Sequence, residues 1–196
     1  MFIELTDHLR CTAEHPESYL VLLPGTMAGR HVVSGELGCP VCGRVVNLVG
    51  GVADFGGGTP SDGRTRLSAD AVAALLGLSG PGGYVALAGG VTSLAEELGK
   101  LLPEVGVVLI NPPEGAVAAS AAGVLRAGRH PLKTGSMRGS VLGADVAANP
   151  QGVRDAVAAV LPGLRVVVEG GEPPEDGVEV LATSPDCWVG SRERVR

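Results

Sequence analysis

Four side chains near the start of the chain could bind a metal ion together. Three residues separate Cys11 from His15, two separate Cys39 from Cys42, and 23 residues lie between the two pairs. Thiolates and an imidazole are ligands that Zn²⁺ prefers, and four protein ligands complete its tetrahedron without leaving an open position. The spacing therefore predicts a structural zinc site, not a catalytic one.

The second pair is the more specific signal of the two. In the segment Cys-Pro-Val-Cys-Gly-Arg, residues 39–44, a short turn lets backbone amides donate hydrogen bonds to the sulfur atoms. Gly43 permits the left-handed conformation that this turn needs. The first pair leaves alternatives open. His15 could be a surface histidine, with His8 or His31 completing the site, or the cysteines could simply be buried.

The composition is that of a folded α/β protein. Of the 196 residues, 45% are hydrophobic and 18% are charged, which supplies enough apolar surface for a core and argues against disorder. Aromatic residues make up only 3% and glycine occurs 31 times, so the core must consist of Val, Leu and Ala packed closely against backbone. The formal net charge of −6 disfavours nucleic-acid binding, which depends on positive charge.

The sequence predicts a cytoplasmic protein that does not enter a membrane. Its longest apolar runs, such as residues 84–88 and 105–110, are much shorter than the ~20 residues that span a bilayer. The N-terminus lacks the basic region and apolar stretch of a secretory signal. In a reducing compartment the cysteines are not expected to form disulfides, which favours metal binding by the clustered ones, whereas Cys187 stands apart.

The chain divides into three predicted parts. Strand-like runs at 19–23, 31–37 and 44–49 belong to a zinc-ribbon module over residues 1–55. Residues 56–66 are rich in Gly, Pro and Ser and lack an apolar period, which is typical of a linker. Residues 67–196 form the predicted α/β domain.

Helical and strand-like segments alternate in this second domain. Its first predicted helix has Ser68 as N-cap and Gly77 near its end. The predicted fold class is α/β, in which the small zinc-ribbon β module precedes a Rossmann-like, doubly wound, mostly parallel sheet with an antiparallel C-terminal hairpin. The predicted segments are helices over 67–78, 92–102, from about Glu114 and over 152–161, and strands over 83–90, 105–110, 123–127, 138–143, 164–171, 178–183 and 187–193.

A resemblance to known zinc ribbons covers roughly a quarter of the chain. The segment ELGCPVCGRVVNLVGGVADF, residues 36–55, resembles the second half of the short ribbons in the activator subunit of tRNA and translation-factor methyltransferases. Such ribbons are also fused to some bacterial methyltransferases. The chain departs from the pattern at the first knuckle, where the Cys11 and His15 pair replaces a second CxxC. The resemblance implies a zinc ribbon next to a methyltransferase-like partner.

The α/β domain resembles the class I S-adenosylmethionine-dependent methyltransferases. In that family a glycine-rich loop after the first strand lies against the amino-acid portion of the cofactor, and the matching stretch here is YVALAGGVT, residues 84–92. Gly90 matches a glycine and Gly89 lies beside it, but Ala86 takes the acidic position. Asn111 stands where the family has an acid that accepts hydrogen bonds from the ribose. The resemblance implies Gly89, Gly90 and Asn111 as the cofactor-binding residues.

Other polar residues permit two interpretations each. Glu169, at a strand end, could be a general base or a solvated acid, and His130 lies in a predicted loop. Asp145 and Asn149 are ambiguous, because Asn149 precedes a proline as helix starts often do. A Gly-Gly pair after a strand is also typical of a plain tight turn. These patterns assign no catalytic residue.

Two hypotheses of function follow. In the first, the chain is a zinc-binding, methyltransferase-like protein without catalysis that acts as an interaction or regulatory module, with a protein partner or as a homodimer. In the second, it is an active methyltransferase with an unusual S-adenosylmethionine pocket. The first hypothesis is favoured because Ala88 and Thr92 take two glycine positions of the loop, Ala86 takes the acidic position and Asn111 is neutral. Function depends on the site and not on the fold.

Overall fold

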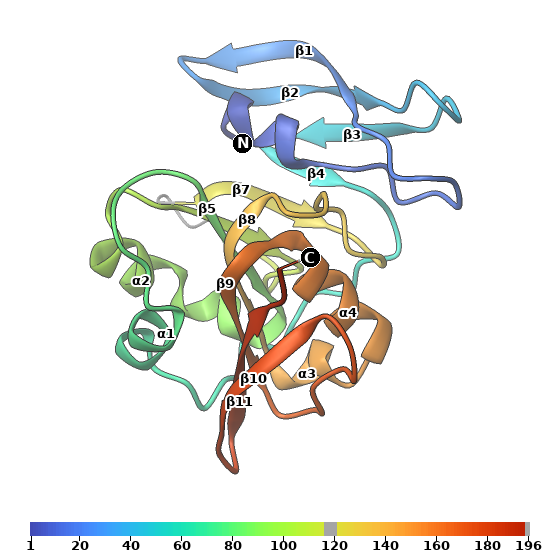
Figure 1. The fold of residues 1–196 in the computed structure, drawn as a ribbon. Coiled ribbons are helices and arrows are strands. Elements are labelled where there is room, and N and C mark those ends of the chain that lie inside the picture. The colour runs from blue at the N-terminus through green and yellow to red at the C-terminus, as the bar shows by residue number, and fades with distance from the viewer. Residues whose placement is uncertain (116–120, 195–196) are drawn as a thin grey trace.

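The strands of the protein form one continuous sheet. The computed structural model describes residues 1–115 and 121–194, whose 11-stranded sheet has the order β1-β2-β3-β4-β7-β6-β5-β8-β9-β11-β10 (Figure 1). The strands are β1 (Val21–Ala28), β2 (His31–Gly38), β3 (Val45–Val49), β4 (Val52–Asp54), β5 (Tyr84–Ala88), β6 (Gly106–Ile110), β7 (Ala121–Arg126), β8 (Met137–Leu142), β9 (Val160–Glu169), β10 (Val178–Thr183) and β11 (Cys187–Arg192).

The middle of the sheet is parallel and both of its ends are antiparallel. The strands β4, β7, β6, β5, β8 and β9 each run parallel to the next. β10 and β11 form an antiparallel hairpin that pairs with β9. This confirms the predicted α/β class, the parallel central sheet and the antiparallel C-terminal hairpin. The order reverses between β5 and β8, because the chain adds β6 and β7 on one side of β5 and then returns to build the other side.

Helices cover both faces of the parallel strands. The helices α1 (Ala69–Leu76) and α2 (Ala95–Leu101) lie on one face, and α3 (Ala144–Ala147) and α4 (Pro150–Ala159) lie on the other (Figure 1). Side chains of β5 alternate accordingly. Val85 and Leu87 pack in the cluster that contains the residues of α1 and α2, while Ala86 and Ala88 pack in the cluster that contains those of α4.

The predicted ends of the first helix are confirmed. The Ser68 hydroxyl accepts a hydrogen bond of 3.2 Å from the backbone N–H of Ala71, and Gly77 closes the helix with a φ of 58°. The helix predicted over 92–102 instead begins as a 3₁₀ turn, η2 (Gly89–Leu94), before α2. The Ala-rich helix predicted from about Glu114 falls on 116–120, outside the described residues.

The N-terminal segment packs against the parallel sheet. β4 extends the sheet by pairing in parallel with β7, and the 3₁₀ helix η1 (Ile3–His8) contributes to the same apolar cluster as α4. Leu5 and Leu9 are fully buried in that cluster. One apolar core thus contains residues from the N-terminal segment and from the C-terminal strands. The predicted division into residues 1–55, 56–66 and 67–196 stays a prediction.

The segment predicted as a linker lies across the carboxyl ends of the parallel strands. Residues 56–66, named the strap from here on, form neither helix nor strand. At its start the Gly56 carbonyl accepts from the N–H of Gly128, at 2.9 Å. In its middle the N–H of Ser61 donates to the Asn111 carbonyl, at 3.1 Å. These bonds hold the strap over the sheet edge where ligands bind in open α/β folds.

The helices of the described residues are short. None of them is both long and apolar enough to cross a lipid bilayer.

Candidate functional site: a metal centre beside a cavity

The four predicted metal ligands meet at one point. The ligand atoms of Cys11, His15, Cys39 and Cys42 all lie within 4.8 Å of one another. The sulfur atoms of Cys11 and Cys42 are 3.7 Å apart, and the Cys39 sulfur is 3.4 Å from Nε2 of His15. A tetrahedral zinc ion places its sulfur and nitrogen ligands ~3.5 to 3.8 Å from one another. These four residues could therefore hold a metal ion.

The imidazole of His15 is oriented for this role. Its Nδ1 lies 2.7 Å from the carbonyl oxygen of Pro16, which favours a proton on Nδ1 and leaves the lone pair of Nε2 facing the sulfur atoms. The two alternative histidines lie elsewhere. The ring of His8 packs edge-on against Tyr84, and the ring of His31 packs against Phe2.

The second knuckle stabilises a thiolate. Burial opposes ionisation of Cys39, but backbone N–H groups of Cys42 and Val41 donate to its sulfur, and its pKa falls to about 6. Burial raises the pKa of the Cys11 thiol to about 11. Gly43 has the left-handed conformation predicted for the turn, with a φ of 71°. A divalent cation would stabilise both thiolates, so metal binding is expected to release protons.

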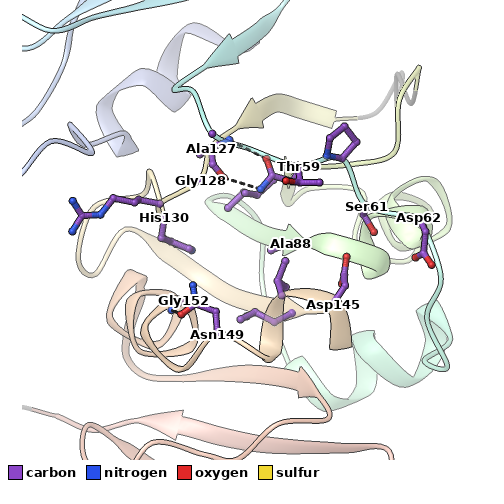
Figure 2. A pocket seen from close by; sticks show the side chains of 17 residues that line it. Thr59, Ser61, Asp62, Ala88, Ala127, Gly128, His130, Asp145, Asn149 and Gly152 are labelled. Atoms are coloured by element: carbon purple, nitrogen blue, oxygen red, sulfur yellow. Dashed lines mark hydrogen bonds between the residues drawn. The ribbon is translucent and has the colours of Figure 1, made fainter.

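A cavity of about 410 Å³ lies next to this centre, at the carboxyl ends of β5, β6, β7 and β8. It sits where the strand order reverses, which is the usual place for a ligand in such a sheet, and its volume is that of a small-molecule site. Figure 2 shows His130 and Asn149 at one side, Ser61 and Asp62 of the strap at the other, and Asp145 between them. Ala88, Ile110, Leu142 and Val146 supply apolar lining.

His130 is the unusual residue of this cavity. Both of its ring nitrogens are buried and have no hydrogen-bond partner among the described residues. Burial lowers the pKa of His130 to about 4, and the nearby positive charge of Arg10 acts in the same direction. The imidazole is therefore neutral at pH 7, with a donor and an acceptor that nothing in the described chain uses. A histidine before a proline gave no sign of this burial in the sequence.

The glycine turn after β5 is filled from within the protein. Gly89 has a φ of 75°, and the N–H of Gly90 donates to Oδ1 of Asp145, at 3.0 Å. A Cβ on Gly90 would overlap the carbonyl oxygen of Arg64 in the strap. Both glycines thus permit close packing of the chain on itself. Neither belongs to the residues that line the cavity, whereas Asn111 does.

Asn111 ties β6 to the end of β7 through its side chain. Its amide nitrogen donates to the Ala127 carbonyl at 2.8 Å, and its amide oxygen accepts from the Ala127 N–H at 2.9 Å (Figure 2). The residue adopts a φ of 52°, a left-handed conformation that Asn tolerates better than most residues. Its side chain is therefore engaged by backbone groups, although it borders the cavity.

Replacing Asn111 with Asp is expected to destabilise the protein by about 1 to 3 kcal/mol, because a carboxylate cannot donate to the Ala127 carbonyl and would face it at hydrogen-bond distance. Asn149→Asp is the matched control. Asn149 only accepts, from the N–H groups of Gln151 and Gly152 as the cap of α4, and Asp caps equally well. Urea unfolding of both variants checks this. Equal midpoints would contradict the role given to Asn111.

Glu169 matches neither of its two interpretations, a general base or a solvated acid. It is buried, and its two carboxylate oxygens accept from the Thr65 hydroxyl at 2.8 Å and from the Arg66 N–H at 2.6 Å. The carboxylate therefore anchors the end of the strap. Because this partnership joins residues over 100 positions apart, local sequence could not predict it.

Comparisons with known proteins provide little further help. No family model matches the chain, and no curated protein matches it. Among solved structures, the antibiotic-resistance methyltransferase Kmr is similar with 11% sequence identity and a TM-score of 0.43, over 70% of this chain and 99% of that one. This likeness is too distant to assign an activity.

Proposed function

We propose that this chain is a zinc-binding, methyltransferase-like protein that acts as an interaction or regulatory module and does not use S-adenosylmethionine. Zinc is the proposed metal because three thiolates and an imidazole suit it best among common divalent ions. The methyltransferase-like part rests on the resemblance of residues 84–92 and on the parallel sheet in which that segment forms the central strand and its turn.

The observation that carries the proposal is the occupied glycine turn. In the family that the domain resembles, this backbone lies against the cofactor. Here the Asp145 carboxylate accepts the N–H of Gly90, and the Arg64 carbonyl packs on the same residue. The side-chain amide of Asn111 is also occupied, by hydrogen bonds with the carbonyl and the N–H of Ala127. A cofactor would have to displace several internal hydrogen bonds, each at a cost of roughly 1 kcal/mol.

Exposed apolar side chains support the interaction role. Six of them lie on the strands β1, β2 and β3, whereas the rest of the described sheet exposes Leu161, Val180 and Leu181. Pro24 and the irregular register of β1 beside it protect this sheet edge against simple strand addition. The proposed interactor is a protein partner or a second copy of the chain. The side chains are Val21, Leu23, Met27, Val33, Val45 and Val49.

The cavity favours a second candidate function. A hollow of about 410 Å³ at the reversal of strand order is the kind of place where an active methyltransferase with an unusual pocket would bind its cofactor. The occupied turn makes this the weaker proposal.

Calorimetric titration of the metal-loaded protein with S-adenosylmethionine and with S-adenosylhomocysteine separates the two candidates. We expect no saturable heat, which corresponds to a Kd weaker than ~1 mM. Asn111→Asp is expected to give no binding either. Saturable binding at micromolar concentration would overturn the proposal, provided that Ile110→Trp, which fills the cavity, abolishes it.

A further inference from the structure

The metal centre and the cavity share a wall. Residues 128–130, which follow β7, line the cavity of about 410 Å³. Arg129 and His130 also line a second hollow of about 380 Å³, together with Cys11 and His15 of the metal centre. The loop that contains His130 thus lies between the cavity and the first metal knuckle.

Arg10, which directly precedes the ligand Cys11, makes most of the contacts between the first metal knuckle and the loop that contains His130. Its Nε donates to the His130 carbonyl at 3.0 Å, and its Nη2 lies 3.1 Å from Oδ2 of Asp155 on α4. Its backbone N–H donates to the Pro131 carbonyl at 2.8 Å. The Arg10 and Asp155 side chains are only 23% and 22% exposed, so the pair is partly shielded from water.

A second arginine supports the same loop from the other direction. Arg129 donates to the Thr12 carbonyl at 3.4 Å and lies 3.5 Å from the Glu14 carboxylate. Both acceptors lie between the ligands Cys11 and His15. The position of the loop therefore depends on the conformation of residues 10–15, which the metal would fix at two points.

We propose that metal binding controls the order of this cavity wall through Arg10, and that the metal centre thereby keeps the His130 imidazole buried within the wall. The proposal rests on metal binding by the Cys/His cluster and not on any use of S-adenosylmethionine. Without the metal, residues 10–15 lose two fixed points, and the bonds from Arg10 and Arg129 no longer restrain the loop.

The reactivity of His130 toward diethyl pyrocarbonate, followed residue by residue with mass spectrometry at pH 7.5, measures this order. The exposed ring of His31 in the same chain is the internal reference. We expect His130 to react slowly in the metal-loaded protein and at least about tenfold faster after chelation. The amide protons of Gly128 and Lys133, which are hydrogen-bonded to Gly56 and His8, should exchange faster in parallel.

Variants separate local coupling from unfolding of the whole ribbon. Arg10→Ala is expected to raise the reactivity of His130 at least about tenfold while metal content, measured by elemental analysis, stays unchanged. The matched control is Arg30→Ala, because Arg30 pairs with Glu4 on the exposed surface. If Arg10→Ala loses metal, Asp155→Ala decides, since it removes the acceptor that holds Arg10 to α4 and leaves the knuckle intact.

Two results would overturn the proposal. One is that His130 in the metal-retaining variants reacts as slowly as in the wild type. The other is that chelation accelerates exchange only within the ribbon and leaves His130, Gly128 and Lys133 unaffected. If elemental analysis finds no metal in the purified chain, the premise of metal binding is wrong. The Arg10 and Asp155 variants would still test whether Arg10 holds the loop that contains His130.

Discussion

Protein stripped of its metal by a strong chelator is expected to lose the structure of β1, β2 and β3 while the helical signal of α1, α2 and α4 remains. All three helices lie after residue 66, and α1 and α2 share an apolar cluster with the central strands. Structural zinc in small modules contributes about 10 to 16 kcal/mol to folding.

The strands β1, β2 and β3 are expected to depend on the metal because they bury few apolar side chains of their own. β1 exposes most of its side chains to solvent, and β3 buries only alternate residues. In β1, β2 and β3 the buried apolar side chains are Val32, Leu37, Val46 and Leu48, and four such side chains do not offset the ordering of three strands on their own. The N-terminal residues and β4 pack on the parallel sheet and should stay ordered longest.

Hydrogen exchange and circular dichroism after chelation check this expectation. Cys39→Ser should reproduce the effect of the chelator, whereas Cys187→Ser, which changes the cysteine outside the cluster, should leave the ribbon amides protected. Protection of β2 and β3 that survives both the chelator and Cys39→Ser would show that the metal does not hold the ribbon together.

Gly90→Ala is expected to destabilise the protein by about 3 kcal/mol, because the new Cβ would overlap the Arg64 carbonyl oxygen. The backbone on both sides is fixed, so relief requires movement of the strap. Arg64 is followed by Thr65 and Arg66, which the Glu169 carboxylate holds. A change of one methyl group should therefore release a segment that spans the sheet edge.

The control for this substitution is Gly152→Ala in α4. There the Cβ would meet only the Asn149 side chain, at 3.6 Å or beyond, and alanine favours the helix by roughly 0.5 to 1 kcal/mol. Urea unfolding of both variants, with proteolysis of the strap as a second readout, measures the difference. A Gly90→Ala protein as stable as the wild type would mean that the strap does not lie on the glycine turn.

The features predicted correctly from the sequence are those that local spacing determines. Cys39, Cys42 and Gly43 specify a knuckle within a few residues, and Ser68 and Gly77 specify the ends of a helix. Alternating strand and helix patterns were enough to predict the α/β class. In each case the pattern is contained in residues that are close together in the sequence.

The features that the sequence did not predict depend on distant contacts. The strap looks like a flexible linker by composition, yet Glu169 and Asn111 hold it from strands far along the chain. Asn111 looks like a weakened ribose ligand until Ala127 is seen to engage both of its amide atoms. His130 is buried, and Arg10, which donates to its carbonyl, lies 120 residues away in the sequence. No local pattern encodes such partners.

Native mass spectrometry of the chain, purified without added metal and then mixed with an excess of S-adenosylmethionine, tests the whole account most directly. The expected spectrum shows the chain with one zinc ion and no cofactor adduct, since the Cys/His cluster is assembled and the glycine turn is occupied by Asp145 and Arg64. A stoichiometric S-adenosylmethionine adduct, or a chain that carries no metal, would contradict it.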